Sequence, residues 1–148
     1  MNSLNKSVAL LFIRLLLGII FFMQGFGKVF TWGVDNVYEN FFKASYSEML
    51  PDFIIKSTAY YTSYAELIFG FFLIIGFQRD LALYVLASVL LIASFGHGMT
   101  DPIWDLSHVM YRAVLLVALL FLPSELDKFR LDTYIKKKIA PIKSKLFS

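Results

Sequence analysis

The chain has 148 residues, of which 58% are hydrophobic and 18% aromatic, while only 17% are charged. Soluble domains are about 45–50% apolar, and a chain of this length buries too little surface to hide the excess in one core. The composition therefore excludes an ordinary soluble domain and predicts an integral membrane protein. The chain has no cysteine, which excludes disulfides, thiolate metal sites and thiol catalysis.

Four stretches are long and apolar enough to cross a bilayer, which takes about 20 mostly apolar residues. They are residues 8–30, 58–77, 81–99 and 102–122. We therefore predict an all-α fold, a polytopic membrane four-helix bundle over residues 1–124 whose first stretch is a retained helix. Asp101 followed by Pro102 is typical of a helix start, because a carboxylate caps free N–H groups and proline lacks one.

The connections between these stretches differ in length and character. Residues 78–80 leave room only for a tight turn, so the second and third helices are expected to form an antiparallel hairpin. Residues 31–57 mix aromatic with acidic side chains, which predicts an amphipathic segment in the membrane interface. Residues 125–148 interleave apolar side chains with lysines, and we expect them to form a basic amphipathic tail.

Lysine and arginine are distributed unevenly over the predicted connections. Nine lie on the side that holds both termini, and two, Lys43 and Lys56, lie on the opposite side. Because such residues collect on the cytoplasmic side, we expect a multi-pass protein of the bacterial inner membrane with cytoplasmic N- and C-termini. The basic tail is interpreted as contacting anionic lipid. Nucleic acid is not expected as a partner, since no groove-reading or base-stacking domain accompanies the tail.

Three ionisable residues lie near the middle of the predicted spans: Arg14, Glu66 and Arg112. A charge near the bilayer centre costs about 2.5–3.5 kcal/mol on insertion scales, so these side chains are expected to face one another. Their positions along the helices place all three within the middle half of a core about 30 Å thick. We predict a shared ion cluster with one surplus positive charge, suited to a quinone carbonyl, an anionic head group or the carboxylate of a partner.

Further polar residues gather towards the predicted outer ends of the helices. Together with the three charges they predict a polar funnel that opens outward; they are Gln24, Lys28, His97, Asp101, Asp105 and His108. A ligand-facing role and a structural one, in which the charges fix helix register, both remain open. For Lys28 and Asp101 the simpler interpretation is snorkelling or capping at the interface. Two histidines near the surface give little support for haem, and no tight ligand spacing favours a metal site.

Four glycines are predicted to serve helix packing: Gly18, Gly25, Gly70 and Gly76. Gly18 and Gly25 share a helix face with Arg14 and Lys28. Because glycine has no side chain, these positions let a neighbouring helix come close beside the charges.

The order of these residues along the chain resembles the DoxX family, a group of four-helix membrane proteins. The resemblance covers roughly residues 8–123. It rests, in chain order, on Arg14, Gly18, Gly25, Lys28, Glu66, Gly70, Gly76, Arg79, Asp101, Asp105 and Arg112. It implies a link to redox or detoxification complexes, because the group takes its name from the small membrane subunit of an archaeal thiosulfate:quinone oxidoreductase.

The same resemblance also implies an assembly role. Related families include a helper of methylamine dehydrogenase maturation and eukaryotic chaperones or cargo receptors. The absence of cysteine argues against direct thiol or sulfur relay chemistry in this chain.

Three functions are compatible with the sequence. The favoured one is an accessory or quinone-interacting membrane subunit of a redox complex, with Glu66 and Arg112 at the head group and aromatic walls around the ring. The second is a non-catalytic assembly, chaperone or structural subunit that docks other membrane subunits or a second copy. A small transporter is the least favoured, since four spans without an inverted repeat offer little for alternating access. No self-contained catalytic motif decides whether the chain is an enzyme, and a quinone is the only cofactor suggested.

Overall fold

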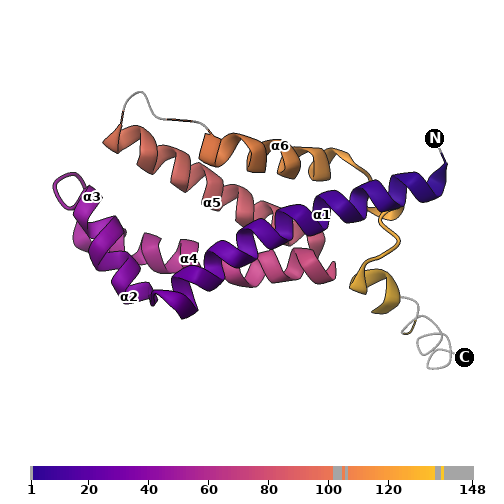
Figure 1. The fold of residues 1–148 in the computed structure, drawn as a ribbon, viewed down its shortest axis with the longest axis horizontal. Coiled ribbons are helices and arrows are strands. Elements are labelled where there is room, and N and C mark those ends of the chain that lie inside the picture. Colours follow the sequence, from indigo (N-terminus) through magenta and orange to yellow (C-terminus); the bar gives the residue numbers. More distant parts are fainter. Residues whose placement is uncertain (1, 102–104, 106, 136–137, 139–148) are drawn as a thin grey trace, which may run out of the picture.

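Four long helices form an elongated bundle in the computed structural model (Figure 1), which describes residues 2–101, 105, 107–135 and 138, with Ser3 and His108 described by their backbone only. They are α1 (Ser3–Phe26), α4 (Asp52–Ile75), α5 (Arg79–Thr100) and α6 (Ser107–Phe121). Contacts run from α1 to α4, α4 to α5, α5 to α6 and α6 back to α1. The described chain contains no strand, and the predicted all-α membrane bundle is confirmed.

The first three helices lie close to the predicted spans. α5 extends the predicted stretch 81–99 by a residue or two at each end. α1 starts before residue 8 and continues as a π-helix, η1 (Gly27–Thr31). α4 starts at Asp52 instead of residue 58, because Pro51 precedes the first turn and Asp52 lies in it, where a carboxylate favours the positive end of the helix dipole.

The fourth predicted span differs most from the structure. Residues 102–104 and 106 lie outside the described residues, and α6 has 15 residues, fewer than a span requires. The described chain contains three helices long and apolar enough to cross a membrane: Leu4–Thr31, Asp52–Ile75 and Arg79–Thr100. The predicted role of Asp101 as a helix start is wrong. Asp101 ends α5, and the Asp105 carboxylate accepts a hydrogen bond from the Ser107 N–H at 2.8 Å.

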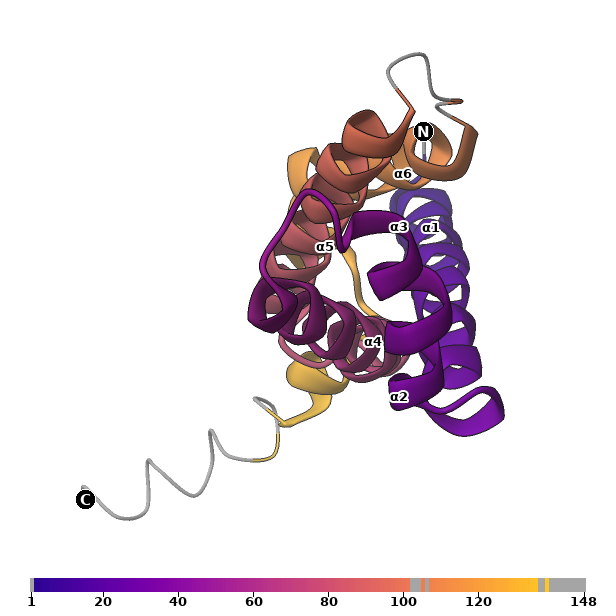
Figure 2. The same cartoon turned by 90° about the vertical axis from the view of Figure 1, so that its left-hand side faces the viewer.

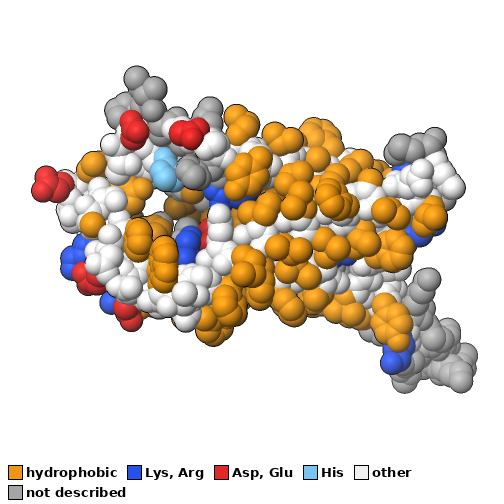
Figure 3. Space-filling model, in the orientation of Figure 1, with side chains coloured by type: hydrophobic (Ala, Val, Ile, Leu, Met, Phe, Trp, Pro, Cys, Tyr) orange, Lys and Arg blue, Asp and Glu red, His pale blue; other side chains and the backbone are white. Residues whose placement is uncertain are grey.

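The surface of the bundle is apolar over most of its length. In the three candidate spans only 33%, 39% and 28% of the most apolar window is buried inside the molecule. Figure 3 shows hydrophobic side chains over the middle of the molecule, with charged side chains gathered towards its two ends. A soluble protein rarely exposes so large an apolar surface to water, so these faces contact lipid.

The tightest packing lies between α1 and α4. A Cβ atom added at Gly25 would lie 2.2 Å from the Leu67 backbone nitrogen, and one at Gly70 would lie 2.5 Å from the Phe22 nitrogen. Gly18 contacts α4 in the same way, near Ile74. These three glycines therefore hold the two backbones in contact and fix which residues of α1 and α4 lie at the same level.

Gly76 has a different role from the other predicted packing glycines. It ends α4 with φ of 69°, a left-handed conformation that glycine adopts without strain. A Cβ atom there would also lie 2.9 Å from the Cα of Arg130. Gly76 thus turns the chain towards α5 and leaves room for the segment that follows α6.

Residues 27–50 form a cap over one end of the bundle. Figure 2 shows this cap from the end, lying across the long helices. It consists of η1, α2 (Val34–Val37), η2 (Tyr38–Lys43) and α3 (Ala44–Tyr46). Buried Tyr38 packs against Ile55 and Ala59 of α4. The Tyr38 hydroxyl donates a hydrogen bond to Asp52, and this bond, with burial, raises the pKa of Tyr38. A membrane-interface position for the cap stays a prediction.

The segment after α6 packs on the opposite end of the bundle. η3 (Ser124–Leu126) begins it, and the Leu126 carbonyl accepts a hydrogen bond from the Ser7 hydroxyl at 2.7 Å. The Asp132 N–H donates to the Gly76 carbonyl at 3.3 Å. Asp127, which the sequence analysis assigned to the tail of residues 125–148, is buried against the bundle, and the boundary at residue 125 stays a prediction. Residues 136–137 and 139–148 lie outside the described chain.

Candidate functional site

The three charges predicted to share one cluster belong to two groups at different levels. The glycine contacts set Gly25 of α1 beside Glu66 and Leu67 of α4, and Gly18 beside Ile74. Arg14 lies one turn beyond Gly18, so it reaches the end of α4 and not its middle. The structure therefore brings Glu66 near Arg112 and separates both from Arg14.

The first group, the Arg14 group, consists of Arg14, Arg79 and Asp127. The Arg14 Nε lies 3.0 Å from an Asp127 carboxylate oxygen, and both side chains are almost fully buried. The Arg14 guanidinium also donates hydrogen bonds to the Leu73 and Ile74 carbonyls at the end of α4. A positive charge at a helix C-terminus is favoured by the helix dipole. These contacts join α1, α4 and the segment after α6.

Arg79 repeats this arrangement at the end of α6. Its side chain is buried and donates hydrogen bonds to the Leu119 and Leu122 carbonyls. Its Nε also lies 3.3 Å from the exposed carboxylate of Asp80. From the sequence, Arg79 was a topology signal and part of the family resemblance, but it was not predicted as a buried charge. It lies in a tight turn between two apolar helices, and this position was the available sign that its guanidinium needs acceptors nearby.

The second group, the Lys28 group, consists of Gln24, Lys28, Glu66 and Arg112. The Lys28 Nζ donates to the Glu66 Oε2 at 2.7 Å, and the Arg112 Nη1 donates to the Gln24 Oε1 at 2.7 Å. Arg112 also lies near enough to Glu66 to interact with it electrostatically. Glu66 and Arg112 are buried. Lys28 is therefore the partner of Glu66, which corrects its simpler interpretation as an interfacial lysine.

A cavity of about 1250 Å³ lies between the Lys28 group and the cap. It is larger than most ligand pockets, which measure roughly 300–1,000 Å³. Figure 3 shows it as a hollow at the left-hand end, with basic and acidic side chains inside. All four residues of the Lys28 group line it, as do many aromatic and aliphatic side chains of the cap, α4 and α5. We call the Lys28 group the floor of the cavity.

The walls of the cavity add a few neutral polar groups to a mainly apolar surface. Thr58 and Thr62 line it from α4 and Tyr46 from the cap. Burial raises the pKa of Tyr46, so its hydroxyl stays protonated at neutral pH. A Cβ atom at Gly96 of α5 would lie 2.7 Å from that hydroxyl, so the Tyr46 ring fits against α5 because residue 96 is glycine.

The remaining predicted funnel residues are only partly brought together. His97 lines the cavity. Asp101 and Asp105 are exposed at the ends of α5 and α6 and are not among the lining residues, and the side chain of His108 lies outside the described residues. In the part of the chain that the structure describes, no three histidine, aspartate or glutamate side chains are grouped to hold a metal ion.

The charges on the floor determine what the cavity can bind. Lys28 and Arg112 are positive and Glu66 is negative, so the floor carries one formal positive charge in excess. Guanidinium and ammonium groups offer several N–H donors each, while the Glu66 carboxylate accepts hydrogen bonds. Such a floor beneath apolar walls suits a ring or head group that carries oxygen acceptors and partial or full negative charge.

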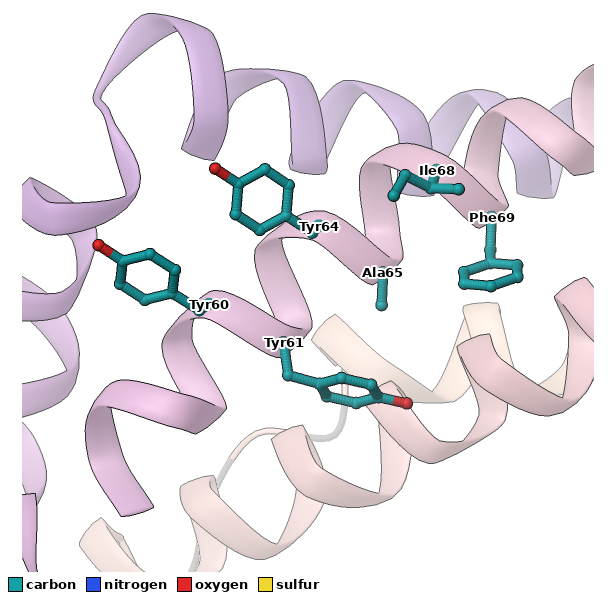
Figure 4. Close-up of a pocket in the computed structure, with 6 residues that line it drawn as sticks. All are labelled: Tyr60, Tyr61, Tyr64, Ala65, Ile68 and Phe69. Carbon is teal, nitrogen blue, oxygen red and sulfur yellow. The ribbon is translucent and has the colours of Figure 1, made fainter. Parts of the chain in front are cut away.

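A second, shallow groove lies on α4 (Figure 4). It measures about 320 Å³, and its lining consists of Tyr60, Tyr61, Tyr64, Ala65, Ile68 and Phe69. The Tyr60 hydroxyl donates to Asp35 of the cap, and the Tyr61 hydroxyl lies 2.6 Å from the Ser88 hydroxyl of α5. No charged side chain lines this groove, and two of its hydroxyls, those of Tyr60 and Tyr61, already bind other elements of the bundle. It therefore contributes to packing and carries no candidate chemistry.

Besides Arg79, one more residue of these groups was not predicted from the sequence. Asp127 was assigned to the tail, so it was not considered as a partner for Arg14. A buried arginine in an apolar helix requires an acceptor, and Asp127 follows the last apolar stretch closely.

Comparison with known proteins identifies a family. The sequence model of the DoxX family matches residues 9–98, which include most of α1, the cap, α4 and almost all of α5. The match stops before Asp101, Asp105 and Arg112, although the sequence analysis extended the resemblance to residue 123. No curated protein and no solved structure matches the chain.

Proposed function

Because the chain belongs to the DoxX family, we propose that it is an accessory membrane subunit of a redox complex that holds a quinone in the cavity above the Lys28 group. The observation that carries this proposal is the combination of a charged floor with apolar and aromatic walls in one membrane cavity. Quinone sites need both features, since the ring packs against apolar side chains while its carbonyl oxygens require hydrogen-bond donors.

The residues of the floor could serve the two needs of a quinone site, which are hydrogen-bond donation and proton exchange. A bound quinone would supply two-electron, two-proton redox chemistry. Arg112, which uses Nη1 for Gln24, would donate a charge-assisted hydrogen bond to a ring carbonyl. The Lys28–Glu66 pair, joined at 2.7 Å, would hold or release a proton at the Glu66 carboxylate. Electrons would come from a partner oxidoreductase, because the chain has no cysteine and no redox motif of its own.

The Arg14 group supports this proposal over a transport function. Its side chains satisfy the carbonyls that end α4 and α6, and none of them lines the cavity. Within the described residues the polar floor thus has no polar continuation towards the opposite end of the bundle. A site reached from one end suits a bound ligand better than a substrate that must cross the membrane.

Native mass spectrometry of the protein, extracted gently from its own membranes, tests the proposal. We expect the wild type to retain a mass that matches a quinone. Arg112→Met removes the donor and should lower quinone retention about tenfold or more, since a hydrogen bond to a charged group contributes about 1.5–3 kcal/mol. Lys43→Met is the matched control, because Lys43 pairs with Glu39 on the surface of the cap.

Three results would contradict the proposal. A wild-type protein that carries no quinone and takes none up when supplied with it would overturn it. Unchanged retention by a folded Arg112→Met variant would remove Arg112 from the site. A protein that carries no quinone but is bound to another protein would favour the second function, an assembly or structural subunit in which the buried charges only stabilise the bundle.

A further inference from the structure

The cavity wall is continuous with the lipid-facing surface of the bundle. Six of its lining residues are also large apolar side chains exposed on the outside: Met23, Trp32, Phe41, Ile54, Leu91 and Phe95. Leu91 and Phe95 are 72% and 69% exposed, and Met23 is 57% exposed. Leu91 lies two helical turns after Tyr84 on the same face of α5, and Tyr84 is 63% exposed without lining the cavity, so this face is the outer one. The cavity therefore reaches the side of the bundle.

Met23, Leu91 and Phe95 mark one side of this cavity, between α1 and α5. α1 and α5 lie across the bundle from each other, since each of them contacts both α4 and α6. The described part of α6 begins at Ser107. Figure 3 shows the hollow beside the start of α6, bounded by the ends of α1 and α5 and by the cap. We call the stretch between Met23 and the Leu91–Phe95 pair the side opening.

The floor lies deep in the span, at the level of the side opening. Glu66 lies well inside the 24-residue helix α4, far from both ends, which at about 1.5 Å per residue places it in the hydrocarbon core. The cap lies between the floor and the end of the bundle, where the Trp32 and Phe41 rings stack with centroids 5.0 Å apart. A molecule dissolved in water would have to pass this aromatic cap, whereas one dissolved in lipid is already at the right depth.

We propose that the ligand is an amphiphile with one long apolar chain, whose head group binds the floor while its chain leaves through the side opening into the lipid. This inference rests on the proposed function and adds to it: the quinone would be a long-chain isoprenoid quinone taken from the bilayer. The charged floor holds the only polar part of such a molecule, and the apolar rim matches the start of its chain.

The test uses two quinones with the same ring, one with a long isoprenoid chain and one with no chain, and the full-length protein in nanodiscs. Binding is followed by quenching of tryptophan fluorescence. Met23→Trp and Leu91→Trp narrow the side opening, and both positions are exposed, so the variants should fold. Phe121→Trp is the matched control, because Phe121 is 84% exposed but lies at the other end of α6, away from the cavity.

We expect the wild type to bind both quinones. Met23→Trp and Leu91→Trp should weaken binding of the long-chain quinone about tenfold and leave binding of the chainless quinone unchanged, while Phe121→Trp changes neither. Equal effects on the two quinones, or none, would overturn the side opening and leave the proposed function standing. Failure of the wild type to bind either ring would instead refute the proposed function.

Discussion

The Arg14 group and the Lys28 group bury the same kinds of charge and use them differently. At one end Arg14, Arg79 and Asp127 are surrounded by backbone carbonyls and by each other. Deeper in the bundle, below the cap, Glu66 and Arg112 bind side chains and face a cavity of about 1250 Å³. Burial alone therefore does not separate a structural charge from a functional one.

The distinction lies in what satisfies each charge. A helix C-terminus presents carbonyls that no intrahelical N–H reaches. An arginine placed there donates hydrogen bonds to these carbonyls, so both the helix end and the guanidinium are satisfied without a ligand. The Lys28 group has no helix end to complete. Its side chains pair η1 with α4 and α1 with α6, away from any free helix end, so the charges are directed towards the cavity. Four predictions test this contrast, in order of decreasing expected effect on stability.

The largest loss of stability is expected from Asp127→Asn. It leaves the Arg14 guanidinium buried without a counter-ion, and breaking a buried pair costs about 3–5 kcal/mol. Thermal unfolding in detergent should show a clearly lower midpoint, with quinone retention unchanged in the protein that remains folded. Glu125→Gln changes a neighbouring exposed carboxylate and should leave the midpoint as it is. A stable Asp127→Asn variant would mean that the carbonyls alone satisfy Arg14.

A smaller loss is expected from Gly25→Ala, which would place a Cβ atom 2.2 Å from the Leu67 backbone nitrogen. The helices must separate, and overpacking of this kind costs about 1–3 kcal/mol. Gly27→Ala is the matched control two residues away, because a Cβ atom there meets nothing within 4 Å. Equal unfolding midpoints for the two variants would show that α1 and α4 do not depend on this crossing.

At the cavity end, Glu66→Gln should affect binding more than stability. The glutamine oxygen still accepts a hydrogen bond from Lys28, so we expect a loss of about 1 kcal/mol in unfolding free energy. Retention of quinone should fall about tenfold because the proton-accepting carboxylate is gone. If this variant unfolded as readily as Asp127→Asn and still retained quinone, the two ends would be alike and both groups structural.

The smallest effect is expected from Lys43→Met. Lys43 pairs with Glu39 at 3.2 Å across one turn of the cap, with both side chains exposed. Exposed pairs of this kind contribute little, so neither the unfolding midpoint nor ligand retention should change measurably. A marked loss of ligand in this variant would instead show that the cap surface takes part in binding.

The sequence was sufficient to predict the long helices, but it did not predict which residues of neighbouring helices lie at the same level. Apolar runs predicted α1, α4 and α5 closely, since span length follows from bilayer thickness. Arg14 was predicted to lie level with Glu66 because the depth of each residue in the bilayer was counted from the end of its own predicted span. The register between helices is set by Gly18, Gly25 and Gly70, and this contact brings Arg14 to the end of α4.

The candidate site was predicted in part. Gln24, Lys28, Glu66, His97 and Arg112 were placed in one polar funnel, and all five line the cavity. The cavity itself was beyond sequence analysis, because its size depends on how residues 27–50 fold across the bundle. The pairing of Lys28 with Glu66 was missed for a related reason: a lysine near a helix end has water or lipid head groups as the simplest partner, unless a neighbouring helix presents an acid at the same level.

The glycine crossing also has a mechanical consequence. With Gly25 and Gly70 in backbone contact across the two helices, α1 and α4 have no room to slide or tilt against each other, so they form the stiff spine of the molecule. Gln24 and Glu66 both project from this spine and keep a constant separation. Any widening of the cavity to admit a ligand must come from α5, α6 or the cap, so Arg112 on α6 and Lys28 at the start of the cap are the members of the floor that can move relative to Gln24 and Glu66.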